Sequence, residues 1–236
     1  MVNKSVVIVG ASSGIGKALA KLCAGEGATV HLISRSEDKL NKVKNEIGER
    51  ALVHPMDMLD EDSVNKVFSD IGEFDYLTVS AVADETKLMQ PIKSMSTEIA
   101  QRGMEKFWGT FNCCRAASNH ISSDGAIVVT SSIAIDRPSK NGASVMNAAS
   151  AAVNVFAKAL ALEIAPVRVN VIAPGVVGTG VWSEKDKESY EKWGKETLLV
   201  GHLGKAEELA HAYYSLLTNT YISGSTLAVD GGLTLL

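Results

Sequence analysis

The stretch GASSGIG, residues 10–16, decides the fold. It joins an apolar run at residues 6–9, which is typical of a buried strand, to an amphipathic stretch at residues 16–26, which is typical of a helix. Glycine is favoured in such a turn because a Cβ atom would block either the tight bend or the approach of a phosphate. The stretch therefore predicts a turn whose peptide N–H groups and helix N-terminus hold a pyrophosphate.

The same alternation of strand and helix continues along the 236 residues. Further apolar runs predict strands at residues 28–33, 51–56, 74–80, 126–130, 167–172 and 226–229. Helical patterns lie at 37–47, 97–119, 148–164 and 207–217, and Asp60 is positioned to cap another helix. This predicts an α/β fold: one doubly wound Rossmann-type domain over residues 1–236, with a seven-stranded, mainly parallel sheet covered by helices on both faces. Residues 176–204 are too long for a plain connection, so we expect an irregular segment that serves as a substrate lid.

Composition and charge exclude several classes of function. The net charge is -4 and the sequence pI is about 5.8, which gives nucleic acid or an anionic membrane no basic surface to bind. Charged residues interrupt the apolar stretches before they reach membrane-spanning length, and the chain begins in a strand instead of a leader. The histidines and cysteines have no metal-ligand spacing. We therefore expect a cytoplasmic protein with no metal, no nucleic-acid partner and no membrane partner.

Several ordered motifs resemble those of the short-chain dehydrogenase/reductase family. Residues 10–16 are similar to its G-x-x-x-G-x-G turn, and Asp57 resembles its adenine-contacting aspartate. Residues 168–175 with Thr179 resemble its R-V-N-x-x-x-P-G-x-x-x-T segment, and residues 222–232 resemble its C-terminal strand signature. The resemblance runs the length of the chain and implies an NAD(P)-dependent oxidoreductase.

The resemblance also implies which residues contact the cofactor. They come from the glycine-rich turn, from the ends of the second, third and fourth strands, and from the segment after the sixth strand. They are Gly10, Ser12, Ser13, Gly14, Ile15, Gly16, Arg35, Ser36, Asp57, Met58, Ser80, Ala81, Pro174, Gly175, Val177 and Thr179.

Arg35 indicates which nicotinamide cofactor is bound. An NAD site normally places a carboxylate after the second strand, roughly 20 residues beyond the turn, to accept a hydrogen bond from the ribose 2′-hydroxyl. Here that place holds Arg35 followed by Ser36. A guanidinium would meet a 2′-phosphate with charge-assisted hydrogen bonds. The alternative is a solvated arginine at a strand end, but no carboxylate competes at this position, and we therefore predict NADP(H).

The catalytic residues implied by the resemblance are mostly absent. The positions of the family's proton-donating Tyr and its Lys fall on Met146 and Ser150, and the position of its Asn falls on Lys106. Ser132 occupies the position of the family's serine. A buried Lys106 would have a lowered pKa and could donate a proton, although a lysine paired with a carboxylate or extended to solvent is the more common arrangement.

Near these positions, the family's Asn-Asn-Ala-Gly segment is here residues 79–82, VSAV. In the predicted lid, Trp182, Tyr190 and Trp193 either cover a hydrophobic substrate or pack the lid itself.

Two functions remain open at this point. The first is an atypical NADP(H)-dependent oxidoreductase that acts on a small molecule, a carbonyl or quinone-like compound whose reduction needs little acid assistance. The second is a pseudoenzyme that binds NADP(H) as a sensor or a partner-binding module. The resemblance implies a homodimer or homotetramer formed partly by the helical regions 97–119 and 148–164.

Overall fold

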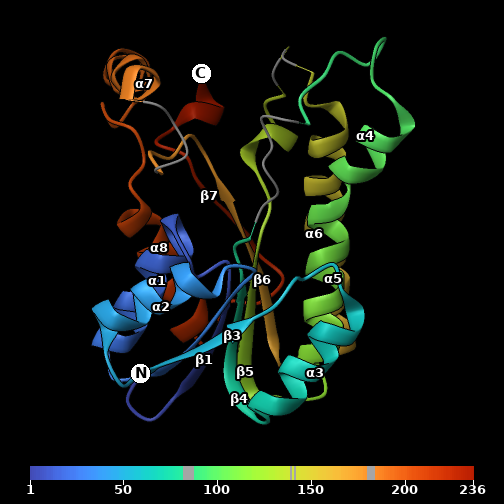
Figure 1. Ribbon diagram of the computed structural model, residues 1–236. Helices are drawn as coiled ribbons and strands as arrows, with labels where there is room; N and C mark the ends of the chain where they lie inside the picture. Colours follow the sequence, from blue (N-terminus) through green and yellow to red (C-terminus); the bar gives the residue numbers. More distant parts are fainter. Residues whose placement is uncertain (82–87, 139, 141, 180–183) are drawn as a thin grey trace.

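A parallel sheet forms the centre of the molecule (Figure 1). The computed structural model describes all residues except 82–87, 139, 141 and 180–183. Within these described residues the sheet has seven strands in the order β3-β2-β1-β4-β5-β6-β7, and each neighbouring pair is parallel. The strands are β1 (Ser5–Val9), β2 (Thr29–Ser34), β3 (Ala51–Pro55), β4 (Phe74–Val79), β5 (Ile121–Thr130), β6 (Arg168–Pro174) and β7 (Thr226–Val229). This order confirms the predicted doubly wound α/β fold.

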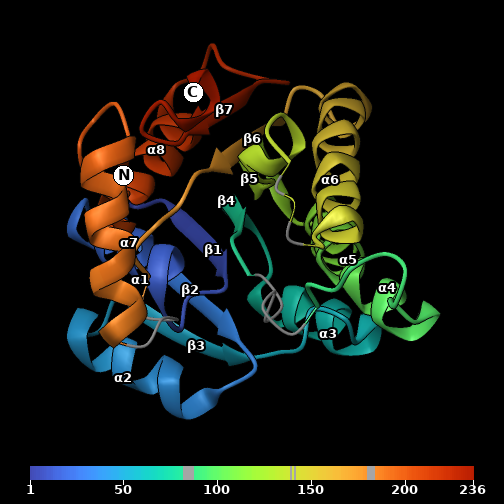
Figure 2. The same ribbon diagram turned by 90° about the horizontal axis from the view of Figure 1, so that it is seen from above.

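Helices cover both faces of the sheet because the strands are apolar on both sides (Figures 1 and 2). On one face, a core cluster joins the sheet to α1 (Gly14–Gly25), α2 (Glu37–Ile47) and α8 (Ala206–Thr218). On the other face, a second cluster joins it to α3 (Glu61–Ile71), α5 (Glu105–Ala117) and α6 (Ser144–Glu163). Because helices cover both faces of the sheet, the loops lie at the two ends of the strands.

Local sequence explains how α2 and α3 begin. The Ser36 hydroxyl accepts a hydrogen bond from the backbone N–H of Lys39, and the Asp60 carboxylate accepts one from that of Ser63. Each contact satisfies a backbone donor that the first helical turn leaves without an intrahelical partner. The predicted capping role of Asp60 is confirmed.

The predicted helical region over residues 97–119 forms two helices. The region forms α4 (Thr97–Gly103) and α5, which meet at Met104. A Cβ atom on Gly103 would lie 2.8 Å from Cγ1 of Val145 on α6, so α4 packs very closely against that helix. The Met104 N–H bonds to the carbonyl of Gln101, three residues back, which tightens the last turn of α4. Strand β5 also begins earlier than predicted, at Ile121.

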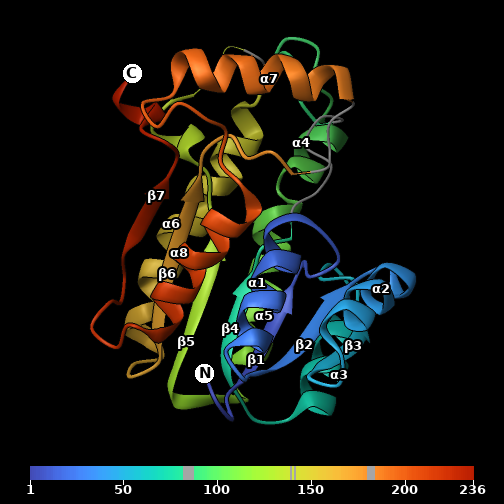
Figure 3. The same cartoon turned by 90° about the vertical axis from the view of Figure 1, so that its left-hand side faces the viewer.

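The expectation of an irregular segment at residues 176–204 is also wrong. It contains α7 (Glu184–Thr197), which lies across the top of the molecule in Figure 3. Trp193 packs against a small core cluster that includes Leu198 and Leu203, whereas Tyr190 is 42% exposed. Trp182 lies outside the described residues. Trp193 therefore packs the segment itself, which is one of the two alternatives that the sequence left open for it.

Helix α6 is long and predominantly apolar. Among the described residues it is the one helix long and apolar enough to cross a membrane, with a mean hydropathy of 1.4 over its best window. The core helix of a soluble protein meets the same test, and α6 packs here against α5 and against strands of the sheet.

Candidate functional site

Four of the predicted site residues each follow the end of a strand. Gly10 follows β1, Ser80 follows β4, Ser132 follows β5, and Gly175 follows β6. In parallel sheets, the carboxyl ends of the strands meet at one edge, which Figure 2 views from above. Strands β1 and β4 lie at the centre of the order, where the direction of winding reverses, and ligands of open α/β sheets bind at this point.

The glycines of the turn are required by close contacts. Gly10 has φ +99°, and a Cβ atom on it would lie 2.6 Å from the backbone nitrogen of Ala81. A Cβ on Gly16 would collide with the carbonyl of Gly10. Gly14 has φ +52°, and its Cβ would lie 3.2 Å from Cγ2 of Thr179. The turn after β1 is therefore pressed against the chain segments that follow β4 and β6.

The N-terminus of α1 lacks the side-chain cap that α2 and α3 have. Ser13 is the N-cap residue, and its backbone is extended, but its side chain forms no capping hydrogen bond. The first turn of the helix thus keeps backbone N–H groups available at its positive end. Together with the glycine turn, this arrangement fits the pyrophosphate of a dinucleotide.

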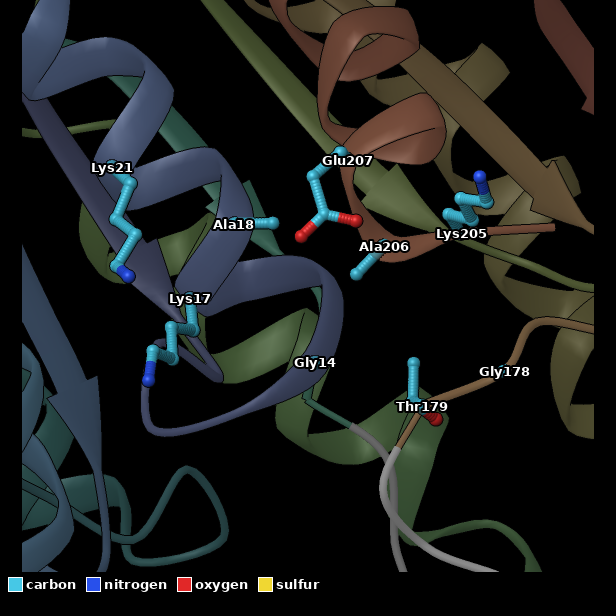
Figure 4. Close-up of a pocket in the computed structure, with 9 residues that line it drawn as sticks. All are labelled: Gly14, Lys17, Ala18, Lys21, Gly178, Thr179, Lys205, Ala206 and Glu207. Atoms are coloured by element: carbon cyan, nitrogen blue, oxygen red, sulfur yellow. The ribbon is translucent and has the colours of Figure 1, made fainter. Parts of the chain in front are cut away.

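A shallow pocket of about 280 Å³ lies beside this turn, between α1 and the start of α8 (Figure 4). The Glu207 carboxylate points into the gap between the two helices, and Thr179 lies opposite it. Lys17 and Lys21 point away from Glu207 and form ion pairs with Glu46 of α2. Both lysines also line the pocket, and their ion pairs with Glu46 link α1 to α2 at the surface.

Arg35 and Ser36 lie between β2 and α2, beside the turn on the adjacent strand. Arg35 is exposed, and Ser36 caps α2. After β3, the Asp57 carboxylate accepts a hydrogen bond from the N–H of Leu59, and Met58 packs on Gly109 of α5. The predicted adenosine-side residues are thus grouped at the ends of β2 and β3.

After β6, the predicted contacts lie on an ordered segment. The Gly175 N–H bonds to the carbonyl of Val229 at 3.0 Å, and a Cβ on Gly175 would lie 2.6 Å from Cα of Asp230. Val177 forms a parallel bridge with Gly204, and Thr179 follows it toward Gly14. Pro174 ends β6 itself. Val82, the last residue of the VSAV segment, lies outside the described residues, while Ser80 donates a hydrogen bond to the Val9 carbonyl.

Lys106 and Ser150 are in direct contact. Lys106 of α5 is 7% exposed, and its Nζ donates hydrogen bonds to the carbonyl of Ser131 at 2.9 Å and to Oγ of Ser150 at 3.2 Å. Ser132 follows Ser131, and its Oγ accepts a hydrogen bond from the N–H of Ala134. Met146 is half-buried on α6, with its Cγ 4.0 Å from an ideal Cβ on Gly103. The structure therefore brings two of the singled-out positions together beside Ser132.

Sequence analysis missed Ser131. Its hydroxyl donates to the Ser150 carbonyl at 2.9 Å, and its N–H donates to the Ile172 carbonyl at 2.8 Å. Nothing in the sequence distinguishes Ser131 from Ser132, because both hydroxyls directly follow β5 and their different partners depend on how α6 and the short helix η2 (Ile133–Ile135) pack there.

Thiol and metal chemistry find no support at the strand ends. Cys113 and Cys114 are buried in α5, and burial raises the pKa of Cys114 to about 12, so it stays a thiol. In the part of the chain that the structure describes, no three His, Cys, Asp or Glu side chains gather as metal ligands would.

A glycine-cradled, uncapped helix N-terminus at the switch point of a parallel sheet defines a dinucleotide-binding protein of the Rossmann type. The family model described as enoyl-(acyl carrier protein) reductase matches residues 10–234. The chain belongs to the short-chain dehydrogenase/reductase family, whose members are NAD(P)-dependent oxidoreductases.

Relatives and solved structures agree with this family. The chain is 32% identical to carbonyl reductase family member 4 of Xenopus laevis and 29% identical to the human 3-oxoacyl-[acyl-carrier-protein] reductase, over 99% of each protein. A short-chain dehydrogenase/reductase from Brucella melitensis superposes with a TM-score of 0.90 at 27% identity, covering 99% of this chain and 97% of that one. A small-chain dehydrogenase in complex with NADPH superposes with a TM-score of 0.79 at 28% identity, over 99% and 100% of the two chains.

Proposed function

We propose that the protein is an NADP(H)-dependent oxidoreductase that reduces a small carbonyl or quinone-like compound at the end of β5. The observation that carries this proposal is the N-terminus of α1, which the glycine turn encloses and no side chain caps. Arg35, exposed at the end of β2, is suited to a 2′-phosphate and favours NADP(H) over NAD(H). The NADPH bound by a relative of the same fold supports the choice.

The chemistry follows from the groups around Ser132. When bound, the cofactor supplies a hydride to the substrate carbon, and a proton must reach the substrate oxygen, so that C=O becomes CH–OH. The Ser132 oxygen accepts from Ala134, which leaves its hydrogen available to a substrate carbonyl. The proton comes from solvent or from Lys106, whose ammonium is held one residue away from Ser132.

We further propose that the site is atypical for the family. The resemblance puts Met146 at the position of the family's Tyr and Ser150 at that of its Lys. A thioether has no proton to donate, and Met146 is half-buried against α4 as apolar packing would require. The substrate should therefore be one whose reduced form needs little acid assistance. The names of the relatives, carbonyl reductase and 3-oxoacyl reductase, favour a carbonyl.

The test combines cofactor binding with turnover. NADPH binding is measured by fluorescence, and NADPH oxidation is followed across a panel of ketones, aldehydes, conjugated carbonyls and quinones. We expect tight NADPH binding and turnover of at least one compound, with kcat reduced at least tenfold in Ser132→Ala while NADPH affinity is retained. Tight binding without turnover of any compound would favour the alternative, an NADP(H)-binding pseudoenzyme.

We also propose a homo-oligomer, a dimer or tetramer, that works in the cytoplasm without a membrane or nucleic-acid partner. Large apolar side chains are exposed on α5 and α6: Trp108 is 54% exposed, Val155 69% and Leu162 84%. Such a surface is costly in water and is normally covered by a partner. A second copy of the chain would cover the outer side of α6. This contact would explain why a protein with a net charge of -4 has such an apolar helix at its surface.

A further inference from the structure

Lys106 occupies a place that the surrounding chain has built for an ammonium group. It enters from α5 and is 7% exposed, and its Nζ reaches both the end of β5 and the start of α6. A lysine is seldom buried to this degree unless polar partners replace its hydration shell. The Ser131 carbonyl at 2.9 Å and the Ser150 hydroxyl at 3.2 Å do so here.

Ser131 and Ser150 are also bonded to each other. The Ser131 hydroxyl donates to the Ser150 carbonyl at 2.9 Å, and both serines are almost fully buried. The Ser131 N–H is held by the carbonyl of Ile172 on β6. The side chains of Lys106, Ser131 and Ser150 thus connect α5, the end of β5 and α6. Ser132 is the next residue after Ser131 in the chain.

The direction of the Ser132 hydroxyl depends on this arrangement. Ser132 follows Ser131 directly, and it caps the short helix η2 (Ile133–Ile135) by accepting from Ala134 at 3.1 Å. With one lone pair of its oxygen engaged, the hydroxyl hydrogen turns elsewhere. A small displacement of the Ser131 backbone would move the hydroxyl away from the position in which it can meet a substrate oxygen.

We infer that Lys106, Ser131 and Ser150 form one positioning unit that orients the Ser132 hydroxyl. The Lys106 ammonium enters from α5 and fits beside Ser150 because the serine side chain is small. The inference rests on the proposed function for its catalytic consequence. Its second effect is electrostatic, because a fixed positive charge beside Ser132 stabilises negative charge that develops on the substrate oxygen. Lys106 and Ser150 should then act together and not independently.

A double-mutant cycle tests this coupling. Lys106→Met removes the charge at similar volume, and Ser150→Ala removes the hydroxyl. With the carbonyl or quinone compound of highest turnover in the panel, we expect each single variant to lose at least tenfold in kcat. NADPH affinity should stay within threefold of wild type, and the double variant should be no worse than Lys106→Met. Lys66→Met, an exposed lysine on α3, is the control and should match wild type.

An exchange variant separates positioning from mere structural support. Lys106→Ser combined with Ser150→Lys brings the ammonium to the same place from α6 instead of α5. We expect it to recover at least tenfold in kcat over Lys106→Met. Thermal melting checks that each variant is folded.

Three results would overturn the inference. The losses in kcat could multiply in the double variant, the single variants could keep wild-type kcat, or the exchange variant could be no better than Lys106→Met. If the wild-type protein reduces no compound, the proposed function fails, and the inference is decided by NMR of the protein labelled with 15N at lysine Nζ. Ser150→Ala should then shift the Lys106 signal and speed its proton exchange. An unchanged signal would overturn the positioning unit.

Discussion

Arg35 is the residue to which we assign the proposed preference for NADP(H). Its guanidinium is exposed at the end of β2 and is suited to the 2′-phosphate that distinguishes NADPH from NADH. The neighbouring Ser36 is committed to capping α2 through the Lys39 N–H. In the proposed function, Arg35 therefore distinguishes NADPH from NADH, which are otherwise identical where they meet the glycine turn.

Replacing Arg35 should change cofactor preference more than cofactor binding in general. We expect Arg35→Ala to weaken NADPH by roughly ten- to hundredfold, the range that a charge-assisted hydrogen bond of about 1.5–3 kcal/mol gives, and to weaken NADH by less than threefold. Titrations of both cofactors by fluorescence measure this. Lys42→Ala, an exposed lysine of α2, is the control. Equal losses for NADPH and NADH would refute the assignment to Arg35.

At the residue scale, motifs were predictable and side-chain contacts were not. The glycine turn, Asp57 and Gly175 lie at strand ends, as their spacing along the chain indicated. The contact of Lys106 with Ser150 joins positions 44 apart in the chain. It depends on how α5 packs against α6, which no local pattern encodes. For the same reason, the role of Ser131 emerges from the structure alone.

The elements that hold the site are the β1 turn and helix α1. Their approach to the chain after β4 and β6 is so close that Gly10 and Gly16 accept no side chain. Helix boundaries elsewhere were predicted well where caps are local, at Ser36 and Asp60, because a cap depends on three or four consecutive residues. The break between α4 and α5 was missed because the packing of Gly103 on Val145 is a long-range contact.

Two glycines of α1 provide a matched pair. Gly16→Ala places a Cβ against the carbonyl of Gly10, whereas a Cβ on Gly25 meets nothing within 4 Å. We expect Gly16→Ala to abolish NADPH binding and to lower the melting temperature. Gly25→Ala should be neutral or stabilise by up to about 1 kcal/mol, since alanine is the better helix former. Isothermal titration and thermal melting distinguish them, and normal binding by Gly16→Ala would contradict the close-packed turn.

Strands β2 and β3 carry a histidine pair that makes stability depend on pH. Nδ1 of His31 lies 3.0 Å from Nε2 of His54, and Nε2 of His31 lies 3.1 Å from Oγ of Ser5. Burial, and then the nearby His54, lower the pKa of His31 to about 4. Burial also lowers the pKa of His54. The folded protein therefore keeps His31 neutral where the unfolded chain, with a pKa near 6.5, takes up a proton.

The unfolded state binds more protons between about pH 6.5 and pH 4, so stability should fall as the pH falls through that window. We expect His31 to contribute a loss of about 2–3 kcal/mol in the free energy of unfolding between pH 7 and pH 4. Urea unfolding of the wild type and of His31→Leu at both pH values measures it, because the shared titration of the carboxylates cancels in the difference. Parallel pH profiles for the two proteins would contradict this prediction.

At the scale of the whole molecule, the parallel sheet lies between two apolar cores. A further set of apolar side chains is exposed on the outer side of α5 and α6. Composition and periodicity predicted the sheet because buried parallel strands are apolar throughout. Composition and periodicity predicted residues 176–204 less well. Helix α7 is strongly charged, and only a few of its residues, such as Trp193, are apolar. Among the residues that the structure describes, nothing buries the outward apolar side chains Trp108, Val155 and Leu162 of α5 and α6.

The proposed oligomer should form through that outer surface. We expect light scattering after size-exclusion chromatography to give a dimer or tetramer for the wild type. Val155→Glu combined with Leu162→Glu should shift it toward the monomer, because charges would be buried in the contact. Tyr221→Glu is the control for added charge, because Tyr221 is exposed and lies far from this surface in sequence. A wild-type monomer at micromolar concentration would refute the oligomer.

A crystal structure of the protein with NADPH would show directly whether the cofactor binds as proposed. We predict the pyrophosphate at the N-terminus of α1 between Gly10 and Gly16, the 2′-phosphate on Arg35, and the nicotinamide beside Ser132 with an open space for substrate between them. A 2′-phosphate that leaves Arg35 untouched, or a nicotinamide excluded from the end of β5 by Lys106 and Met146, would contradict the account.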